Sequence, residues 1–340
     1  FFTCWALFFA AFRPVMPFAA ETAAFPDGTP VTGGRILMGT IGEPSNLIPY
    51  MASDSASGEI TGLLYVAPLK YDKDLNVVPW AAASYEVLEG GRLLRFVLRD
   101  DIRWEDGVPL TADDVEFTYK LMIDPKTPTA YSGDFLAIES FKKTGRLSFE
   151  VRYAKPFARS LMTWMGAILP KHVLEGQDIM TTPVARKPIG AGPYRLAKWD
   201  AGSMLTLTAS DTYFEGRPNL DEVVYRIIPD PSTMFLELKA GKLDMMSLSP
   251  QQYLRQTQGP QWERDWRKYR YLSFSYTFLG FNLEHPFFKD VRVRRAISMA
   301  IDRQSLIDGV LLGQGVPTVG PYKPGTWAYN DKLTPVRQDV

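Results

Sequence analysis

Residues 99–115 read RDDIRWEDGVPLTADDV and contain the signals of a tight turn and of a helix start. Gly107 suits the turn, because a residue without a Cβ atom adopts backbone conformations that other residues avoid. Thr111 is a typical helix-capping residue. Asp113 and Asp114 then place carboxylates in the first helical turn, next to the positive end of the helix dipole. The stretch therefore predicts a turn followed by a capped helix.

Alternating apolar and polar residues predict strands on both sides of this stretch. Apolar and polar residues alternate in part over residues 93–98. In residues 147–153 the apolar Leu147, Phe149 and Val151 fall on one face, as in a half-buried antiparallel strand. Further strands are expected at residues 35–42, 204–208 and 222–228. The first of these strands should lead into a polar loop at residues 42–46, where glycine and proline end regular structure.

Capping residues, proline and glycine mark the ends of the predicted helices. The helix that begins after Thr111 should end before Pro125. Further helices are expected between Ser232 and Gly241 and from Ser249-Pro250 to Gly259. Two more should begin at Asp290 and at Asp302, both before Gly313. Strands and helices thus alternate along the chain, which predicts a mixed α/β fold.

Length and composition limit the classes of protein that fit. The chain has 340 residues, enough for two or three domains. Its 38 Lys and Arg residues balance 38 Asp and Glu residues, so it has no net charge to attract nucleic acid. Apolar residues make up 46%, which is typical of a globular protein rather than of a disordered chain or a polytopic membrane protein.

The sequence contains no established catalytic or metal-binding motif. One Cys and two His residues cannot form a disulfide framework or a Cys-rich zinc site. Asp72, Asp74 and Asn76 have calcium-loop spacing, but Val77 and Ala83 stand where glycine and glutamate are required, so a surface turn is expected. These observations favour a binding protein. An enzyme that uses carboxylates alone remains an alternative.

The first 24 residues have the features of an export signal. Residues 1–12 are almost wholly apolar, too short to cross a bilayer of about 30 Å, and are followed by alanines that suit cleavage near Ala20 or Ala24. A buried N-terminal helix is the alternative. Because the sequence opens on Phe1, we expect residues 1–24 to be the remnant of a signal peptide.

Three groups of motifs lie between Arg35 and Pro321. They are Arg99–Val115, then Pro188–Tyr194, Tyr213–Pro218 and Ala240–Asp244, and finally Phe281-Asn282, Asp290–Ile297 and Ala300–Arg303. Together they resemble a known family, extracytoplasmic solute-binding protein family 5, which comprises the periplasmic oligopeptide-, dipeptide- and nickel-binding proteins of ABC importers. Ala191 stands where Thr is commoner in the family. We expect Trp104, Gly107, Gly192 and Asp302 to hold turns and helix ends rather than ligand.

The resemblance implies a two-lobe, hinged periplasmic binding protein of the type II-like class with an extra domain inserted in lobe 1. Residues 25–54 and 184–270 would form the central domain of lobe 1, and residues 55–183 the inserted domain. Residues 271–340 would begin lobe 2. Because the family builds that lobe from many more residues, we expect lobe 2 to be incomplete in this sequence, with its peptide-terminus anchors beyond Val340.

The function implied by the resemblance is capture of peptides in a cleft between the lobes and delivery to an inner-membrane ABC permease with its ATPase subunits. The protein would be a periplasmic monomer and not an enzyme, with no cofactor, no metal and no nucleic-acid partner. The resemblance leaves open whether the protein is also anchored by lipid at the outer face of the membrane and whether it also presents ligand to a chemoreceptor. It also leaves open a different solute, such as a nickel chelate, haem, an opine or an oligosaccharide.

Candidate ligand-binding residues follow from their positions in the family pattern. A buried peptide backbone needs hydrogen-bond partners, which hydroxyl and amide side chains can supply. The candidates are Ser45, Asn46, Ser53, Ser247, Ser249, Tyr271 and Tyr276. For the two tyrosines, packing in an ordinary core is the alternative.

Overall fold

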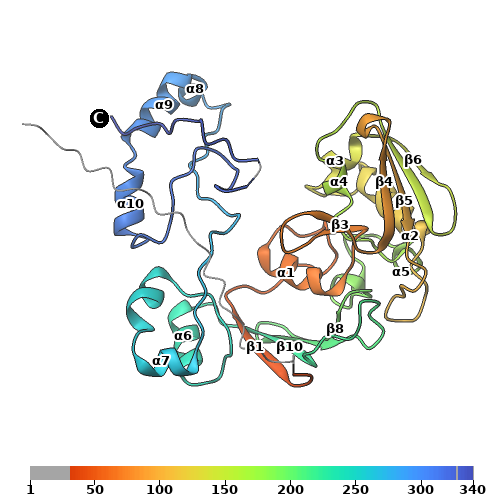
Figure 1. Cartoon of the computed structure of the whole chain (residues 1–340), viewed down its shortest axis with the longest axis horizontal. Helices are drawn as coiled ribbons and strands as arrows, with labels where there is room; N and C mark the ends of the chain where they lie inside the picture. The colour runs from red at the N-terminus through yellow and green to blue at the C-terminus, as the bar shows by residue number, and fades with distance from the viewer. Residues whose placement is uncertain (1–30, 327, 340) are drawn as a thin grey trace, which may run out of the picture. The chain divides into compact units, whose positions relative to one another are not determined.

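The computed structural model describes residues 31–326 and 328–339. The expected signal peptide at residues 1–24 lies outside these residues. The chain divides into two compact units, of which one ends at Ser247 and the other begins at Leu248 (Figure 1). Among the described residues, no helix combines the length and the apolar character that crossing a bilayer requires.

One sheet of the first unit is built from both ends of that unit. It contains β1 (Arg35–Thr40), β8 (Tyr194–Asp200), β9 (Met204–Ala209) and β10 (Glu222–Ile227) in the order β1-β10-β9-β8. The strands β1 and β10 are parallel, and the other pairs are antiparallel. The strands predicted at residues 35–42, 204–208 and 222–228 are therefore confirmed, with small shifts at their ends.

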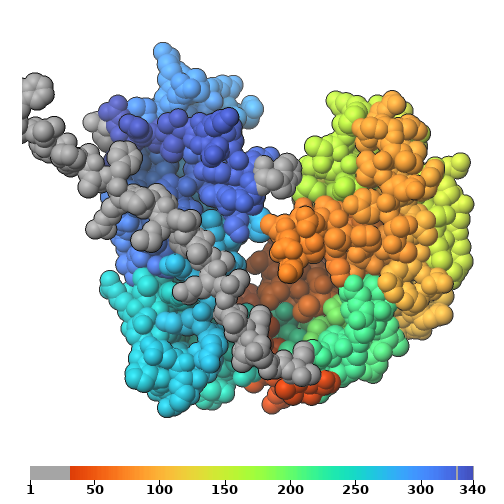
Figure 2. Space-filling model, in the orientation of Figure 1, coloured from red at the N-terminus to blue at the C-terminus, as the bar shows by residue number. Residues whose placement is uncertain are grey.

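A second four-stranded sheet lies between these segments in the sequence. It contains β4 (Ala82–Leu88), β5 (Leu93–Leu98), β6 (Ile138–Lys143) and β7 (Ser148–Tyr153), all antiparallel in the order β4-β5-β7-β6. Phe96 and Phe149 face each other across β5 and β7, and their rings stack with centroids 4.7 Å apart. In Figure 2 the orange and yellow-green atoms of these segments, distant in sequence, lie side by side.

Short elements complete the first unit. They are α1 (Ser55–Leu64), β2 (Leu69–Tyr71), β3 (Val77–Pro79), η1 (Glu89–Gly91), α2 (Ala112–Ile123), α3 (Ser132–Leu136), α4 (Ser160–Thr163), α5 (Lys171–Leu174), η2 (Pro183–Ala185) and α6 (Pro231–Lys239). The helix predicted after Thr111 is α2, with Thr111 and Asp114 forming its capping box. The predicted surface turn is also confirmed, because an Asp72 carboxylate oxygen accepts hydrogen bonds from the backbone of Asp74 and Asn76.

The named elements of the second unit are short helices, separated by long stretches of irregular chain. It contains η3 (Gln252–Gln256), α7 (Pro260–Asp265), α8 (Pro286–Lys289), α9 (Val291–Ala300) and α10 (Arg303–Gly309). Asp290 caps α9 and Asp302 caps α10, as predicted.

Two predicted helix details are wrong. The helix α6 is capped by Asp230 rather than by Ser232, because Pro231 occupies its first turn and Asp230 accepts from the Thr233 backbone. After Pro250, residues 252–256 form a π-helical turn rather than a regular α-helix.

Gly190 and Gly192 bring three parts of the first unit into close contact. The Gly192 N–H donates to the Leu64 carbonyl at the end of α1, and the Glu105 N–H donates to the Gly190 carbonyl. Both hydrogen bonds are 2.9 Å long. A Cβ atom at position 190 would lie 1.9 Å from the Leu64 oxygen. Only glycine allows this approach, which ties α1 to the turn after buried Trp104 and to the start of β8.

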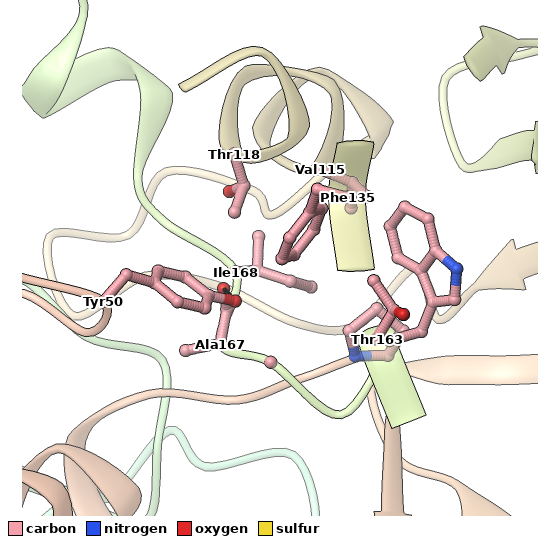
Figure 3. Close-up of a pocket in the computed structure, with 10 residues that line it drawn as sticks. Tyr50, Val115, Thr118, Phe135, Thr163, Ala167 and Ile168 are labelled. Atoms are coloured by element: carbon pink, nitrogen blue, oxygen red, sulfur yellow. Dashed lines mark hydrogen bonds between the residues drawn. The ribbon is translucent and has the colours of Figure 1, made fainter. Parts of the chain in front are cut away.

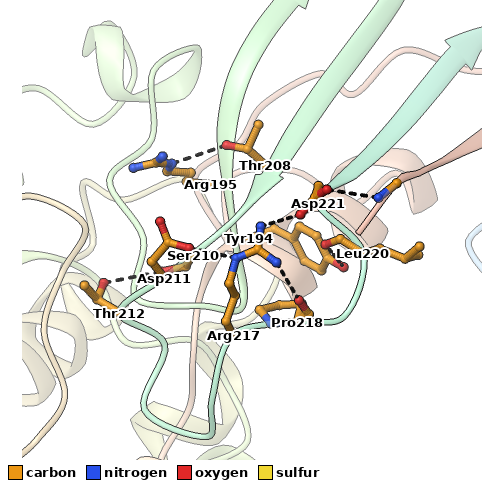
Figure 4. Close-up of polar contacts among 11 residues, drawn as sticks. Tyr194, Arg195, Thr208, Ser210, Asp211, Thr212, Arg217, Pro218, Leu220 and Asp221 are labelled. Carbon is orange, nitrogen blue, oxygen red and sulfur yellow. Dashed lines mark hydrogen bonds and ion pairs between the residues drawn. The ribbon is translucent and has the colours of Figure 1, made fainter. Parts of the chain in front are cut away.

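The motif at Tyr213–Pro218 is also structural. Arg217 forms ion pairs with Asp211 at 2.7 Å and with Asp221 at 2.5 Å, and it donates to the Pro218 carbonyl (Figure 4). The other Asp221 oxygen accepts from the Gly34 N–H at 2.9 Å. Arg217 therefore holds the loop between β9 and β10 and, through Asp221, the residue before β1.

We predict that Gly190→Ala lowers the free energy of unfolding by about 3 kcal/mol or more, because the added methyl group meets a backbone atom that cannot rotate away. Gly62→Ala is the matched control. Gly62 lies in α1 with nothing within 4 Å of its ideal Cβ position, so this substitution should be neutral or stabilising. Urea denaturation measures both changes, and a Gly190→Ala variant as stable as the control would contradict the packing argument.

Candidate functional site

The predicted ligand-binding residues are divided between the two units. The first unit contains Ser45, Asn46, Ser53 and Ser247, and the second contains Ser249, Tyr271 and Tyr276. The first three belong to the loop that runs from β1 into α1. This loop and the first turns of α1 are the best-defined candidate site of the first unit.

A network of hydroxyl groups joins this loop to α1. The Ser45 hydroxyl donates to the Asp54 carboxylate at 2.6 Å, and the Ser57 hydroxyl donates to the same oxygen at 2.8 Å. The Ser57 hydroxyl also accepts from the backbone N–H groups of Ser45 and Asn46. Asp54 is the N-cap of α1 and accepts from the Ser57 N–H at 2.7 Å. The Ser45 hydroxyl thus already has a partner within the protein.

The electrostatics of the network follow from these bonds. Burial alone would raise the pKa of Asp54, but the hydrogen bonds from Ser45 and Ser57 outweigh burial and hold the pKa below its ordinary value. Asp54 therefore stays ionised at neutral pH and fixes the loop at the N-terminus of α1.

The remaining candidates differ in how available their polar groups are. Ser53 and Ser247 are exposed, and neither hydroxyl has a hydrogen-bond partner among residues 31–326 and 328–339. Ser249 accepts from the Gln252 N–H and therefore helps to begin the turn at residues 252–256. Tyr271 and Tyr276 are exposed by 78% and 45%, and the ring of Tyr276 contacts Phe278.

A pocket of about 250 Å³ opens beside the loop, and we call it the α1 pocket. It is lined by Asn46, Ile48, Pro49, Tyr50, Ala52, Ser57, Gly58, Thr61, Tyr131 and Gly166. Asn46 is its one lining residue that the sequence analysis proposed. The others were missed because they match no binding motif, and because Tyr131 and Gly166 lie far in the sequence from the stretch at residues 46–61 that supplies the rest.

Tyr50 shapes the inner wall of the α1 pocket. Its backbone has a φ of 74°, which is uncommon outside glycine, and its hydroxyl donates to the Ala167 carbonyl at 2.8 Å. The Thr129 hydroxyl donates to the Tyr50 carbonyl at 2.8 Å, and the ring of Tyr131 meets that of Tyr50 edge-on at 6.0 Å. Two segments, one at Thr129–Tyr131 and one at Ala167, therefore hold the backbone and ring of Tyr50 in place.

A much smaller void lies on the far side of Tyr50. Figure 3 shows Tyr50, Thr118 and Phe135 facing this space, whose volume of about 10 Å³ barely holds one water molecule. Tyr50 and Gly166 line both spaces, so they form the wall between the α1 pocket and the interior. Burial raises the pKa of the Tyr50 hydroxyl, which therefore stays protonated and able to donate.

Within residues 31–326 and 328–339, no three His, Cys, Asp or Glu side chains are grouped to hold a metal ion. The His172 ring on α5 contacts the carboxylate of Asp106, in the turn after Trp104, at 2.7 Å. The arrangement that stands out is therefore a pocket with uncharged walls.

Comparison with known proteins identifies relatives of the chain. Residues 76–340 match the sequence model of a family described as bacterial extracellular solute-binding proteins, family 5 Middle. The oligopeptide-binding protein AppA from Bacillus subtilis is 32% identical over 89% of this chain and 56% of its own length. The probable D,D-dipeptide-binding periplasmic protein DdpA from Escherichia coli is 25% identical over 94% of this chain and 63% of its own length.

Solved structures show the same fold. AppA from Bacillus subtilis in complex with a nonapeptide superposes with a TM-score of 0.83 at 30% identity, over 92% of this chain and 62% of that one. NikZ from Campylobacter jejuni in complex with Ni(L-His) gives a TM-score of 0.79 at 25% identity, over 90% of this chain and 60% of that one. The predicted fold class, a two-lobe α/β binding protein, is confirmed. The chain spans about 60% of these relatives' lengths.

We predict that Asp54→Ala lowers the free energy of unfolding by about 0.5–2 kcal/mol at pH 7, because α1 loses its cap. The pKa of Asp54 is lower in the folded state than in the unfolded state. Its carboxylate therefore contributes fully to the free energy of unfolding above the ordinary Asp pKa, and this contribution is lost as the pH falls through the folded-state pKa. The difference from wild type should therefore shrink in acid.

Urea denaturation across this pH range measures the effect. Asp100→Ala, at an exposed position, is the control and should change stability by less than about 0.5 kcal/mol. If Asp54→Ala lowered the free energy of unfolding by the same amount at every pH, the ionised carboxylate would not be the source of the stabilisation.

Proposed function

The chain belongs to the bacterial extracellular solute-binding proteins of family 5, and we propose that it captures peptides and delivers them to a membrane ABC permease. The observation that carries this proposal is the likeness to AppA, whose solved structure contains a nonapeptide. AppA is also described as an oligopeptide-binding protein and matches most of this chain at 32% identity.

Two observations favour peptides over a nickel chelate. The relative that holds Ni(L-His) is less similar in sequence, at 25% identity. In addition, the lining of the α1 pocket contains no His, Cys or carboxylate side chain, the groups that usually contact a transition metal or its chelate. A neutral organic ligand matches these walls better.

The proposed mechanism is binding without chemical change. A peptide carries unpaired N–H and C=O groups, and burying them costs free energy unless the protein supplies partners. The free hydroxyls of Ser53 and Ser247 can supply such partners, and so can Asn46, Ser249, Tyr271 and Tyr276. Ser45 would act through the network at Asp54. We place the protein in the periplasm as a monomer whose partner is the permease.

The proposal includes the domain division expected from the sequence. Residues 25–54 and 184–270 would form a central domain, residues 55–183 an inserted domain, and residues 271–340 the beginning of the other lobe. The two sheets support this division, because β1, β8, β9 and β10 come from the first two ranges and β4–β7 from the inserted one.

We predict that the protein binds a mixture of random-sequence nonapeptides in isothermal titration calorimetry and that the bound peptides are released intact. Binding should also raise the melting temperature, because a ligand that binds only the folded state stabilises it. Mass spectrometry of the peptides after several hours checks their integrity. Cleavage in proportion to protein concentration would establish an enzyme instead, and the absence of any binding would contradict the peptide assignment.

We predict that Ser53→Ala and Ser247→Ala each weaken peptide binding by about 0.5–1.5 kcal/mol if the hydroxyl pairs with the peptide backbone. Both hydroxyls lack partners within the described chain, so stability should be unchanged within about 0.5 kcal/mol. Ser84→Ala, at an exposed position in β4, is the control and should leave the affinity unaltered. Unaltered affinity in all three variants would remove Ser53 and Ser247 from the site.

A further inference from the structure

We infer that the α1 pocket is a specificity pocket that receives one uncharged, apolar side chain of the bound peptide. The inference rests on the proposed function and adds to it a place and a chemical preference. Three features of the pocket support it: the burial of its inner residues, the chemistry of its walls, and the two glycines that keep it open.

The lining of the α1 pocket extends from the protein surface to buried residues. Tyr131 stands at the rim with 46% of its surface exposed, and Gly58 is exposed beside it. Ile48 is fully buried and Thr61 is 9% exposed, so the lining passes from solvent into the core of the first unit. An apolar cavity of about 150 Å³ holds a benzene molecule. The 250 Å³ of the α1 pocket therefore suits a leucine or phenylalanine side chain.

The chemistry of the walls selects against charge. None of the ten lining residues is ionisable at neutral pH, and Ile48, Pro49 and Ala52 offer apolar surface next to the rings of Tyr50 and Tyr131. A lysine or aspartate side chain in this pocket would lose its hydration without gaining an opposite charge. An apolar side chain would gain from leaving water in proportion to the area buried.

One polar group in the pocket remains available to the ligand. The Asn46 carbonyl oxygen accepts from the Ile48 N–H at 2.7 Å, which fixes the orientation of the side chain. Its Nδ2 group has no hydrogen-bond partner in the part of the chain that the structure describes. It can donate to a backbone carbonyl of the peptide while the adjacent side chain enters the pocket.

Two glycines keep the pocket open. A Cβ atom at Gly166 would lie 2.3 Å from the Tyr50 hydroxyl oxygen, so any larger residue there would push the Tyr50 ring out of place. Gly58 lines the pocket from α1, and its ideal Cβ position has nothing within 4 Å. A side chain at position 58 would therefore enter open space at the pocket without disturbing the fold.

This geometry gives a matched pair of variants, Gly58→Leu and Gly62→Leu. Both positions lie in α1, both are exposed, and both have open space around the ideal Cβ atom, but only Gly58 lines the pocket. Replacing a helical glycine should not destabilise either variant, and urea denaturation checks this.

The experiment measures binding of a scanning set of nonapeptides in an alanine–serine background, in which one leucine is moved through each position. For the wild-type protein, leucine at one position should raise the affinity roughly tenfold or more over alanine. Gly58→Leu should lose most of this gain, while Gly62→Leu keeps it. Lysine at the same position should give no gain.

The outcomes separate this inference from the proposed function. If the peptides bind but leucine gives no gain at any position, or if Gly58→Leu keeps the gain, the specificity pocket is overturned and peptide binding stands. Loss of the gain in both variants would assign the effect to α1 as a whole and would also overturn the inference. If no peptide binds to the wild-type protein, the proposed function itself fails.

Discussion

The close approach of Gly190 and Gly192 to the end of α1 is the constraint on which the rest of the first unit depends. Backbone meets backbone there, with hydrogen bonds from Gly192 to Leu64 and from Glu105 to Gly190. A side chain at position 190 or 192 would collide with main-chain atoms that cannot move independently. Through this contact, the turn around Trp104 and the start of β8 fix the position of α1.

The candidate site depends on the placement of α1. Its first two turns carry Ser57, Gly58 and Thr61 into the α1 pocket, and its cap Asp54 holds the loop that contains Ser45 and Asn46. The fold motifs and the candidate site thus share one helix. Gly190 does not line the α1 pocket, but its contact with Leu64 fixes the helix that does.

Local chemistry made much of the fold predictable. Alternation of apolar residues located β5 and β7, and capping residues located α2, α9 and α10. These signals act within a few residues, so one segment of sequence is enough to recognise them. The start of α6 was predicted at the wrong residue because Asp230 and Ser232 are both good caps, and the position of Pro231 decides between them.

The site was less predictable because it is made by tertiary contacts. The α1 pocket depends on Tyr50, Tyr131 and Gly166, which lie far apart in the sequence and match no motif. Ser45 was proposed as a ligand residue, yet its hydroxyl bonds to Asp54, since serine pairs readily with nearby groups of its own chain. The sequence predicted this loop as a candidate site, but it could not show which polar groups of the loop already have partners within the protein.

Native mass spectrometry of the protein purified from its own host tests the central claim, peptide capture, most directly. The account predicts a family of complexes whose added masses correspond to short peptides, which leave as intact peptides when the protein is denatured. A single added mass equal to a metal chelate, a haem or a sugar would contradict the account, as would protein that carries no ligand and binds none of the nonapeptides.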